Sequence, residues 1–159
     1  MAFTPPRTSG TRPIVFLGLA GVIYLDDEPT VPTRTERVSA WGRWARDVAV
    51  PEQTAHQVAL LAARADVVWI SEWGHNAHTA FASVLDLPPE PWPTLPVQFG
   101  KLAAIRAYAV GLPWLWIDDP LVIPPDATGD AIVATDPHRG LAGVDVTAVC
   151  DRLIEGAGR

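Results

Sequence analysis

The feature that most constrains the fold is an unbroken apolar run that ends in glycine near the N-terminus. Residues Ile14 to Leu17 lead directly into the glycine-bounded turn Gly18 to Gly21. A short apolar run without alternation is typical of a strand buried on both faces, and such strands occur in parallel sheets. Ligands of open α/β sheets lie beyond the carboxyl ends of the strands. We therefore expect a binding site at residues 18–21.

Further apolar runs alternate with helical patterns along the chain. Strands are expected at 67–70, 114–117 and 131–134, helices at 51–63, 76–87, 101–110 and 144–154, a loop at 26–37, and a short strand or hairpin at 38–50. Strands that alternate with helices within one domain indicate an α/β fold with a doubly wound parallel sheet. This architecture is a Rossmann-like three-layer sandwich.

Length, charge and cysteine content limit the classes of function. A chain of 159 residues with 48% hydrophobic content forms one domain, expected at 13–159 after a disordered tail at 1–12. The formal charge of −6 argues against nucleic-acid binding. The single cysteine, Cys150, suits a reducing compartment, and no apolar run approaches the ~18 residues of a membrane span. We expect a cytoplasmic protein that contacts neither nucleic acid nor membrane.

Four segments carry glycine or polar residues at the expected ends of strands or the start of a helix. They are residues 18–23, Ser71 after Val-Val-Trp-Ile, Lys101 at a helix start, and Asp118-Asp119 after Trp-Leu-Trp-Ile. Singly, each has an ordinary explanation as a turn or a solvated charge. In this order they resemble motifs I to IV of the haloacid dehalogenase-like (HAD) superfamily, over nearly the whole chain from Pro13. The sequences VVWISEWGHNA and LDLPPEPWP resemble a small actinobacterial-type subgroup, and the short inserts imply no separate cap domain.

The resemblance breaks down at the catalytic positions of motif I. Gly21, Val22 and Ile23 match the motif, but Gly18 and Ala20 stand where the family has its two aspartates. In the family, the first aspartate attacks phosphorus and the second acts as acid and base, beside a Mg²⁺ ion held by motif I and motif IV carboxylates. Glycine can neither attack nor bind metal, and alanine transfers no proton. We therefore expect phosphotransfer to be lost or severely impaired.

The remaining motif residues still imply a binding site. The resemblance assigns phosphate binding to the backbone N–H groups from Leu19 to Gly21, including Ala20, with the Ser71 hydroxyl and the Lys101 ammonium. It assigns metal binding to Asp118 and Asp119, but with two of the family's four carboxylates lost, Mg²⁺ should bind only weakly. Lys101 is then expected to pair directly with one of these aspartates.

Two classes of function follow from these residues. The first is a HAD-like domain with a degenerate phosphatase site, catalytically inactive or impaired, that binds a phosphorylated small molecule or protein. The alternative is a Mg²⁺-dependent phosphohydrolase with a rearranged site, in which Asp118 or Asp119 activates water or an acid of the flap supplies the nucleophile. A phosphatase assay distinguishes the two classes.

Residues outside the motifs allow further interpretations. Trp41 and Trp44 lie in the segment after motif I, the flap of the HAD interpretation, where aromatic side chains cover a pocket or contact a partner, so a homodimer through this flap is one candidate assembly. His75 and His78 have the spacing of one helical face, which is compatible with a metal site, although solvated histidines are commoner there. Asp26 to Glu28 could replace the lost acids, although a solvated charge run is the commoner outcome.

Overall fold

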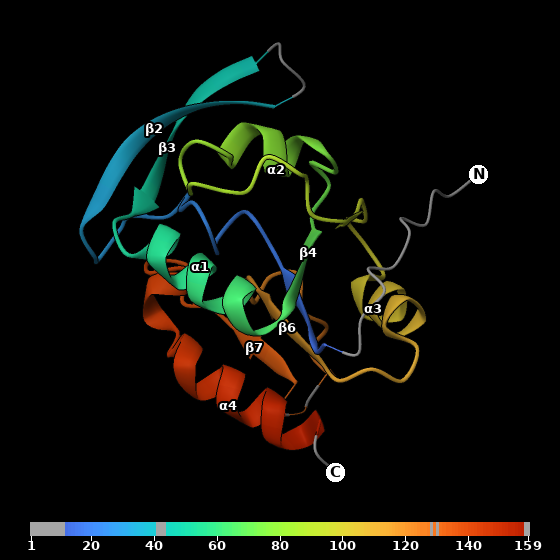
Figure 1. The fold of residues 1–159 in the computed structure, drawn as a ribbon. Coiled ribbons are helices and arrows are strands. Elements are labelled where there is room, and N and C mark those ends of the chain that lie inside the picture. Colours follow the sequence, from blue (N-terminus) through green and yellow to red (C-terminus); the bar gives the residue numbers. More distant parts are fainter. Residues whose placement is uncertain (1–11, 41–43, 128, 130, 158–159) are drawn as a thin grey trace.

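The computed structural model describes residues 12–40, 44–127, 129 and 131–157 (Figure 1). The expected tail, apart from Arg12, and Trp41 of the flap lie outside the described residues. In chain order the elements are β1 (Ile14–Leu17), β2 (Thr33–Ala40), β3 (Trp44–Pro51), α1 (Thr54–Arg64), β4 (Asp66–Ile70), α2 (Asn76–Phe81), β5 (Thr94–Leu95), α3 (Lys101–Ala109), β6 (Trp114–Asp118), β7 (Ile132–Ala134), the 3-10 helix η1 (Leu141–Gly143) and α4 (Val146–Ala157).

Five strands form one parallel sheet with β1 at its centre. The strand order is β5-β4-β1-β6-β7, and every neighbouring pair is parallel. Leu17 is in register with Trp69 of β4 and Ile117 of β6, so the carboxyl ends of these strands meet at one edge. The chain runs from β1 outward through β4 to β5 and then returns to β6. The direction of winding therefore switches beside β1, where open α/β sheets bind ligands.

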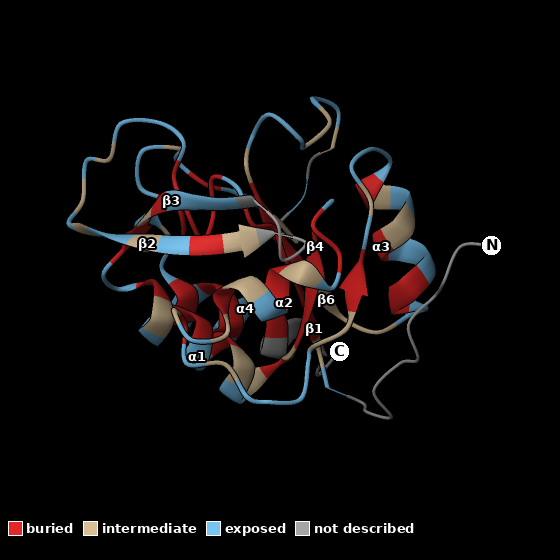
Figure 2. Ribbon diagram, turned by 90° about the horizontal axis from the view of Figure 1, so that it is seen from above, coloured by how far each residue is buried: buried red, intermediate tan, exposed pale blue. Residues whose placement is uncertain are grey.

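Both faces of the sheet are covered by helices, as the alternation of strands and helices predicts. Because successive strand residues point to opposite faces, Val15 and Leu17 pack into one core with α1, α2 and α4. Ile14 and Phe16 pack into a second core with α3. Figure 2 shows that the central strands are buried, whereas much of β2 and β3 is exposed. The expected α/β class with a parallel, Rossmann-like sheet is confirmed.

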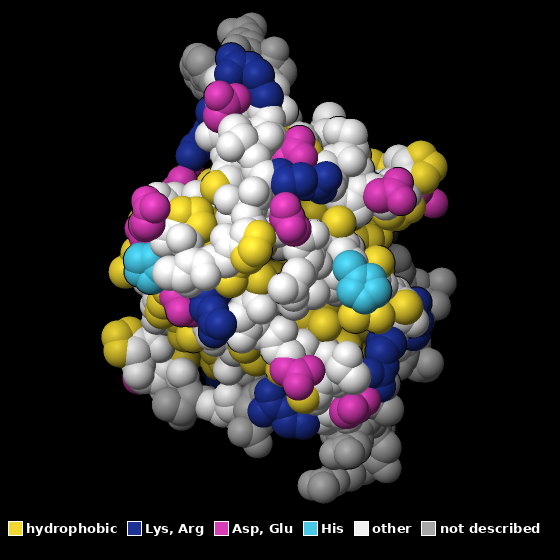
Figure 3. Space-filling model, turned by 90° about the vertical axis from the view of Figure 1, so that its left-hand side faces the viewer, with side chains coloured by type: hydrophobic (Ala, Val, Ile, Leu, Met, Phe, Trp, Pro, Cys, Tyr) yellow, Lys and Arg dark blue, Asp and Glu magenta, His cyan; other side chains and the backbone are white. Residues whose placement is uncertain are grey.

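A β-hairpin follows the central strand, and its first strand corrects the expected loop at 26–37. Residues Thr33 to Arg37 belong to β2 and pair with β3. Pro29 and Pro32 lie before the strand and do not interrupt its pairing. The polar residues of β2 are tolerated because the hairpin projects from the body of the molecule, with basic and acidic side chains on it (Figure 3). Ion pairs such as Arg37–Asp47, at 3.1 Å, link its two strands.

Two helix boundaries differ from the expected ones for local reasons. Pro51 pairs with Thr33 and ends β3, so α1 begins at Thr54 rather than at the proline. Helix α2 ends at Phe81 and is followed by turns over 82–86, and the left-handed φ of +53° at Asp86 prevents a regular helix from continuing to residue 87. Among the helices of the described residues, none is long and apolar enough to cross a membrane.

The proline-rich connection after α2 contains a short edge strand that its sequence does not reveal. Strand β5 has only two residues, Thr94 and Leu95, between Pro93 and Pro96, and its pairing with β4 extends the sheet. Buried His78 holds this connection in place. Its Nε2 lies 2.9 Å from the Pro88 carbonyl oxygen, and its Nδ1 accepts the Trp92 backbone N–H at 3.3 Å. The chain then leads from β5 to the start of α3 at the carboxyl edge.

Candidate anion-binding site

A hollow of about 120 Å³ lies at the carboxyl edge of the sheet. All four of the motif-like segments contribute to its lining, through Leu19, Ala20, Ser71, Lys101 and Asp118. Leu19 and Ala20 follow β1, Ser71 follows β4, Lys101 begins α3, and Asp118 ends β6. The structure thus brings together residues that are about 100 positions apart in the chain.

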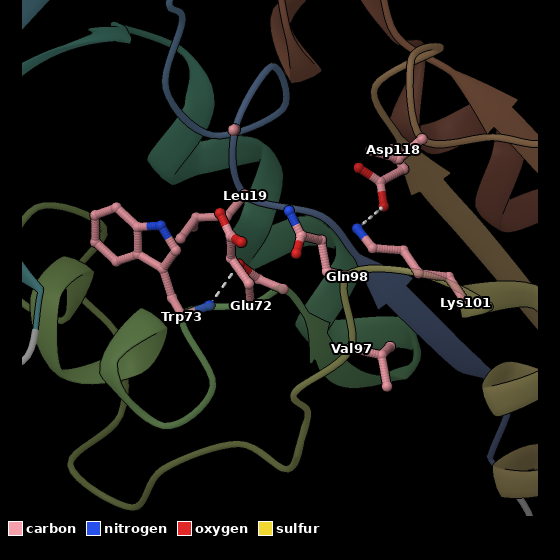
Figure 4. Close-up of a pocket in the computed structure, with 10 residues that line it drawn as sticks. Leu19, Glu72, Trp73, Val97, Gln98, Lys101 and Asp118 are labelled. Atoms are coloured by element: carbon pink, nitrogen blue, oxygen red, sulfur yellow. Dashed lines mark hydrogen bonds and ion pairs between the residues drawn. The ribbon is translucent and has the colours of Figure 1, made fainter.

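Lys101 and Asp118 form a buried ion pair in the wall of this hollow (Figure 4). The lysine Nζ lies 2.8 Å from Asp118 Oδ2 and donates a second bond to the Ile70 carbonyl oxygen at 3.2 Å. Lys101 is 8% exposed and Asp118 is 2% exposed. The expected pairing of the lysine with one of the two aspartates is confirmed, and Asp118 is the partner.

Three N–H donors hold the Asp118 carboxylate. Besides Lys101, the Trp116 indole Nε1 donates to Oδ2 at 3.0 Å, and the Asp119 backbone N–H donates to Oδ1 at 2.8 Å. Burial raises the pKa of Asp118, and the nearby Lys101 charge opposes that rise. The role of Trp116 is not evident from the sequence, where a tryptophan in a strand indicates only core packing.

The Asp118 side chain also explains the glycine at position 18. A Cβ added to Gly18 would overlap the Asp118 carboxylate, because the two residues lie side by side at the ends of β1 and β6. Gly21 has a similar relation to Asp119, whose carboxylate fills the space of a Cβ there, and its φ of +76° independently favours glycine. Both aspartates therefore pack directly against the turn after β1.

The turn after β1 offers fewer backbone donors than expected. Gly21 does not line the hollow, and its N–H donates to the Tyr24 carbonyl oxygen at 2.8 Å. The expected donor role of the Gly21 N–H therefore competes with a hydrogen bond within the turn. The N–H groups of Leu19 and Ala20 have no acceptor among the described residues. They are therefore available as backbone donors at the hollow.

Ser71 adds a hydroxyl to these donors. Its Oγ accepts the backbone N–H of Trp73 at 3.2 Å, which fixes the oxygen and leaves the hydroxyl proton to be donated. Trp73 is buried and forms part of the wall of the hollow. The indole packs against Tyr24 and Phe81, at centroid distances of 5.8 and 5.7 Å. The β4–α2 turn is thereby anchored to the segment after β1.

The donor set of the hollow does not fit Mg²⁺. Mg²⁺ prefers about six oxygen ligands in octahedral geometry. Asp118 already accepts three N–H bonds, and Asp119 does not line the hollow; its Oδ1 accepts the Leu121 backbone N–H at 2.8 Å. Across residues 12–40, 44–127, 129 and 131–157, no group of three or more His, Cys, Asp or Glu side chains could hold a metal ion.

The other candidate residues lie apart from this hollow. Asp26, Asp27 and Glu28 are exposed and line a separate groove beside the hairpin, where Asp26 pairs with Arg46 at 2.8 Å. His75 is exposed, whereas the His78 ring nitrogens contact Pro88 and Trp92, so the two histidines do not form a metal pair. Trp44 begins β3, in the hairpin that follows the central strand.

Three residues of the hollow lie outside the motif-like segments and were not predicted from the sequence. Val97 and Gln98 precede α3, and Val122 follows β6. Their only signal in the sequence is their proximity to Lys101 and Asp118. Comparisons with family models, with curated proteins and with solved structures found no match to this chain.

Proposed function

We propose that this protein is a HAD-like domain that binds a phosphorylated ligand at the hollow and does not transfer its phosphoryl group. The observation that carries the proposal is the convergence of four donors at one place. Leu19 and Ala20, whose N–H groups have no acceptor within the described part of the chain, line the hollow together with Ser71 and Lys101. Backbone N–H groups together with a cation are the usual components of a phosphate site.

The arrangement of the chain supports the HAD-like part of the proposal. The four motif-like segments reach one edge of a parallel sheet, with the first segment on the central strand. The hairpin β2–β3 follows that strand, where the resemblance implies a flap. These placements agree with the order of the motifs along the chain and do not depend on the missing aspartates.

The absence of catalysis follows from the residues beside the donors. Residue 18 provides no carboxylate, and the methyl group of Ala20 can transfer no proton. Asp118 is an unfavourable nucleophile because it is 2% exposed and its oxygens accept three N–H bonds. Each of these bonds stabilises the carboxylate in its resting state.

A second candidate function rests on the position of Asp118. Its carboxylate occupies the space above Gly18, so β6 supplies a carboxylate beside Lys101 where the family would supply one from β1. A phosphohydrolase of rearranged design would use Asp118 to attack phosphorus or to activate water. Such an enzyme would have to release Asp118 from its three donors in each cycle.

Titration with inorganic phosphate tests the first proposal. We expect saturable binding in nuclear magnetic resonance spectra, with the Leu19 and Ala20 amide signals shifting most. Ser71→Ala should weaken binding about tenfold, since it removes one hydrogen bond to a charged group. Lys101→Met should abolish measurable binding, and the matched control Arg106→Met, on the exposed side of α3, should bind like the parent. Phosphate affinity that is unchanged in both Ser71→Ala and Lys101→Met would refute the proposal.

Hydrolysis of p-nitrophenyl phosphate with Mg²⁺ distinguishes the two functions. The binding function predicts no turnover above background. Turnover at rates usual for enzymes, ~1 to 10³ per second, that is abolished by Asp118→Asn would establish the phosphohydrolase instead.

A further inference from the structure

Exposed apolar side chains gather beside the hollow. Among the described residues, the large apolar side chains that are exposed are Phe99 at 84%, Val110 at 64%, Leu121 at 91% and Val122 at 38%. Three of these four belong to the two loops that border the hollow, and Val122 is part of its lining. Phe99 stands in the chain between two lining residues, Gln98 and Lys101, and Leu121 precedes Val122. Single exposed apolar residues are ordinary, but a group at a site indicates a ligand contact.

The size of the hollow determines which part of a ligand it can hold. A volume of about 120 Å³ accommodates a phosphoryl group and the atoms next to it, but not a whole metabolite. The rest of the ligand must lie on the rim, which the loops before α3 and after β6 provide. Val97 and Val122 line the hollow, and the exposed Phe99 and Leu121 stand next to lining residues in these two loops.

The charge at the rim further narrows the class of ligand. Glu72 lines the hollow and is exposed, and it lies on the side opposite Lys101 (Figure 4). Every negative charge on a ligand adds to the repulsion by this carboxylate. A ligand with one phosphoryl group and an uncharged body keeps this repulsion smallest.

We propose that the site selects phosphomonoesters of apolar alcohols or phenols, with the phosphoryl group at Lys101 and the apolar body against Phe99, Leu121 and Val122. This inference rests on the proposed anion site and adds the chemical class of its ligand. The body of the ligand removes exposed apolar surface from water, and this gain is absent for a polar ester. The two loops therefore distinguish esters that the phosphate donors alone would bind equally.

Calorimetric titration with three probes tests the selection. Phenyl phosphate should bind the parent protein about tenfold more tightly than glycerol 2-phosphate, a difference of about 1.4 kcal/mol. Phenol should show no saturable binding, because the apolar contact is too small to act alone. In Phe99→Ser/Leu121→Ser this preference should fall to within about threefold, while the affinity for inorganic phosphate stays that of the parent. Val110→Ser, at an apolar position that is 64% exposed at the far end of α3, is the control and should keep the full preference.

The outcomes separate this inference from the proposed function. Equal affinity of the parent for the two esters would overturn the inference and leave the anion site in place. A preference that survives in Phe99→Ser/Leu121→Ser would overturn it as well, and so would phenol binding as tight as that of phenyl phosphate. The lack of binding of any phosphate by the parent would overturn both. Because Phe99 and Leu121 are almost fully exposed, the double variant should fold, and its circular dichroism spectrum and Tm should match those of the parent.

Discussion

The carboxylate of Asp118 lies over Gly18, in the space that a side chain at residue 18 would need. At the carboxyl ends of two neighbouring parallel strands, there is thus room for a side chain from only one of them. In this protein β6 fills this space with a carboxylate, and β1 leaves it open with a glycine. The same carboxylate holds Lys101 at the edge of the hollow, so the glycine, the aspartate and the lysine form one packing unit.

Gly18→Ala should therefore destabilise the protein. The added methyl group overlaps the Asp118 carboxylate, which cannot move without weakening its bonds to Lys101 and Trp116. We expect a loss of about 1 to 3 kcal/mol in the free energy of unfolding, measured by urea denaturation. Gly143→Ala is the matched control, because a methyl group there meets only the side chain of Arg139. Equal stability of the two variants would mean that Asp118 moves aside at little cost.

Lys101→Met should destabilise the protein through the charge that it leaves behind. Asp118 is 2% exposed and would lose its cationic partner, a change that costs on the order of 3 kcal/mol for a buried pair. Arg106→Met, which removes an exposed charge from the same helix, should change stability by less than about 0.5 kcal/mol. The double variant Lys101→Met/Asp118→Asn should lose less than the sum of its two single changes. Additive losses in that cycle would contradict a direct interaction.

The sequence predicts the strands that position the site because their signals are local. Unbroken apolar runs identify β1, β4 and β6, and the residues after these strands meet at one edge because parallel strands end together. The helix start at Lys101 is likewise visible from its apolar spacing. The order of the motif-like segments is therefore enough to predict which residues gather around the hollow.

The features that the sequence did not predict depend on contacts between distant segments. Thr33 to Arg37 form a strand because β3 pairs with them, although their own pattern is polar. The engagement of the Gly21 N–H with Tyr24 depends on the exact path of the turn. The overlap between positions 18 and 118 depends on a side-chain conformation. For this reason an aspartate pair introduced at Gly18 and Ala20 could restore a metal site only if Asp118 were displaced.

The contribution of Asp118 to stability should decrease as the pH rises. Burial raises its pKa in the folded protein above the ordinary value of 3.8, so the folded state holds the proton more tightly than the unfolded state does. Stability from this group is therefore fully present below pH 3.8 and is lost as the pH rises through the folded-state pKa. Urea denaturation at each pH gives the free energy of unfolding of the parent and of Asp118→Asn. The difference between these two free energies isolates the contribution of Asp118.

Removal of Lys101 should extend that pH window upward. Burial raises the pKa of Asp118, whereas the Lys101 charge and hydrogen bond lower it, so in Lys101→Met only the Trp116 and Asp119 N–H groups still oppose burial and the pKa rises further. The free energy of unfolding of Lys101→Met minus that of Lys101→Met/Asp118→Asn should then decrease up to a higher pH. The corresponding difference between the parent and Asp118→Asn should stop decreasing at a lower pH. The same window in both backgrounds would show that Lys101 does not act on the Asp118 charge.

Tyr24, in the segment that leads from the turn after β1 to the hairpin, should resist ionisation well above the usual range. Its ring is 3% exposed and stacks on Phe81, with a centroid distance of 5.8 Å. Burial and the Asp26 charge raise the pKa of Tyr24 to about 12, from an ordinary 10.0. Because the folded state holds this proton more tightly, the stability from Tyr24 is present below pH 10 and is lost as the pH rises through about 12.

The ultraviolet absorbance of tyrosinate checks this value. The chain has two tyrosines, so Tyr108→Phe leaves Tyr24 as the reporter. We expect a midpoint near 12 in that variant, or a later step that coincides with alkaline unfolding in circular dichroism. The Arg46 guanidinium lies 5.3 Å from the ring centroid and lowers the pKa, so Arg46→Ala should move the midpoint further upward. A midpoint near 10 in the folded protein would mean that water reaches the Tyr24 phenol. It would contradict the packing of this ring that the structure has.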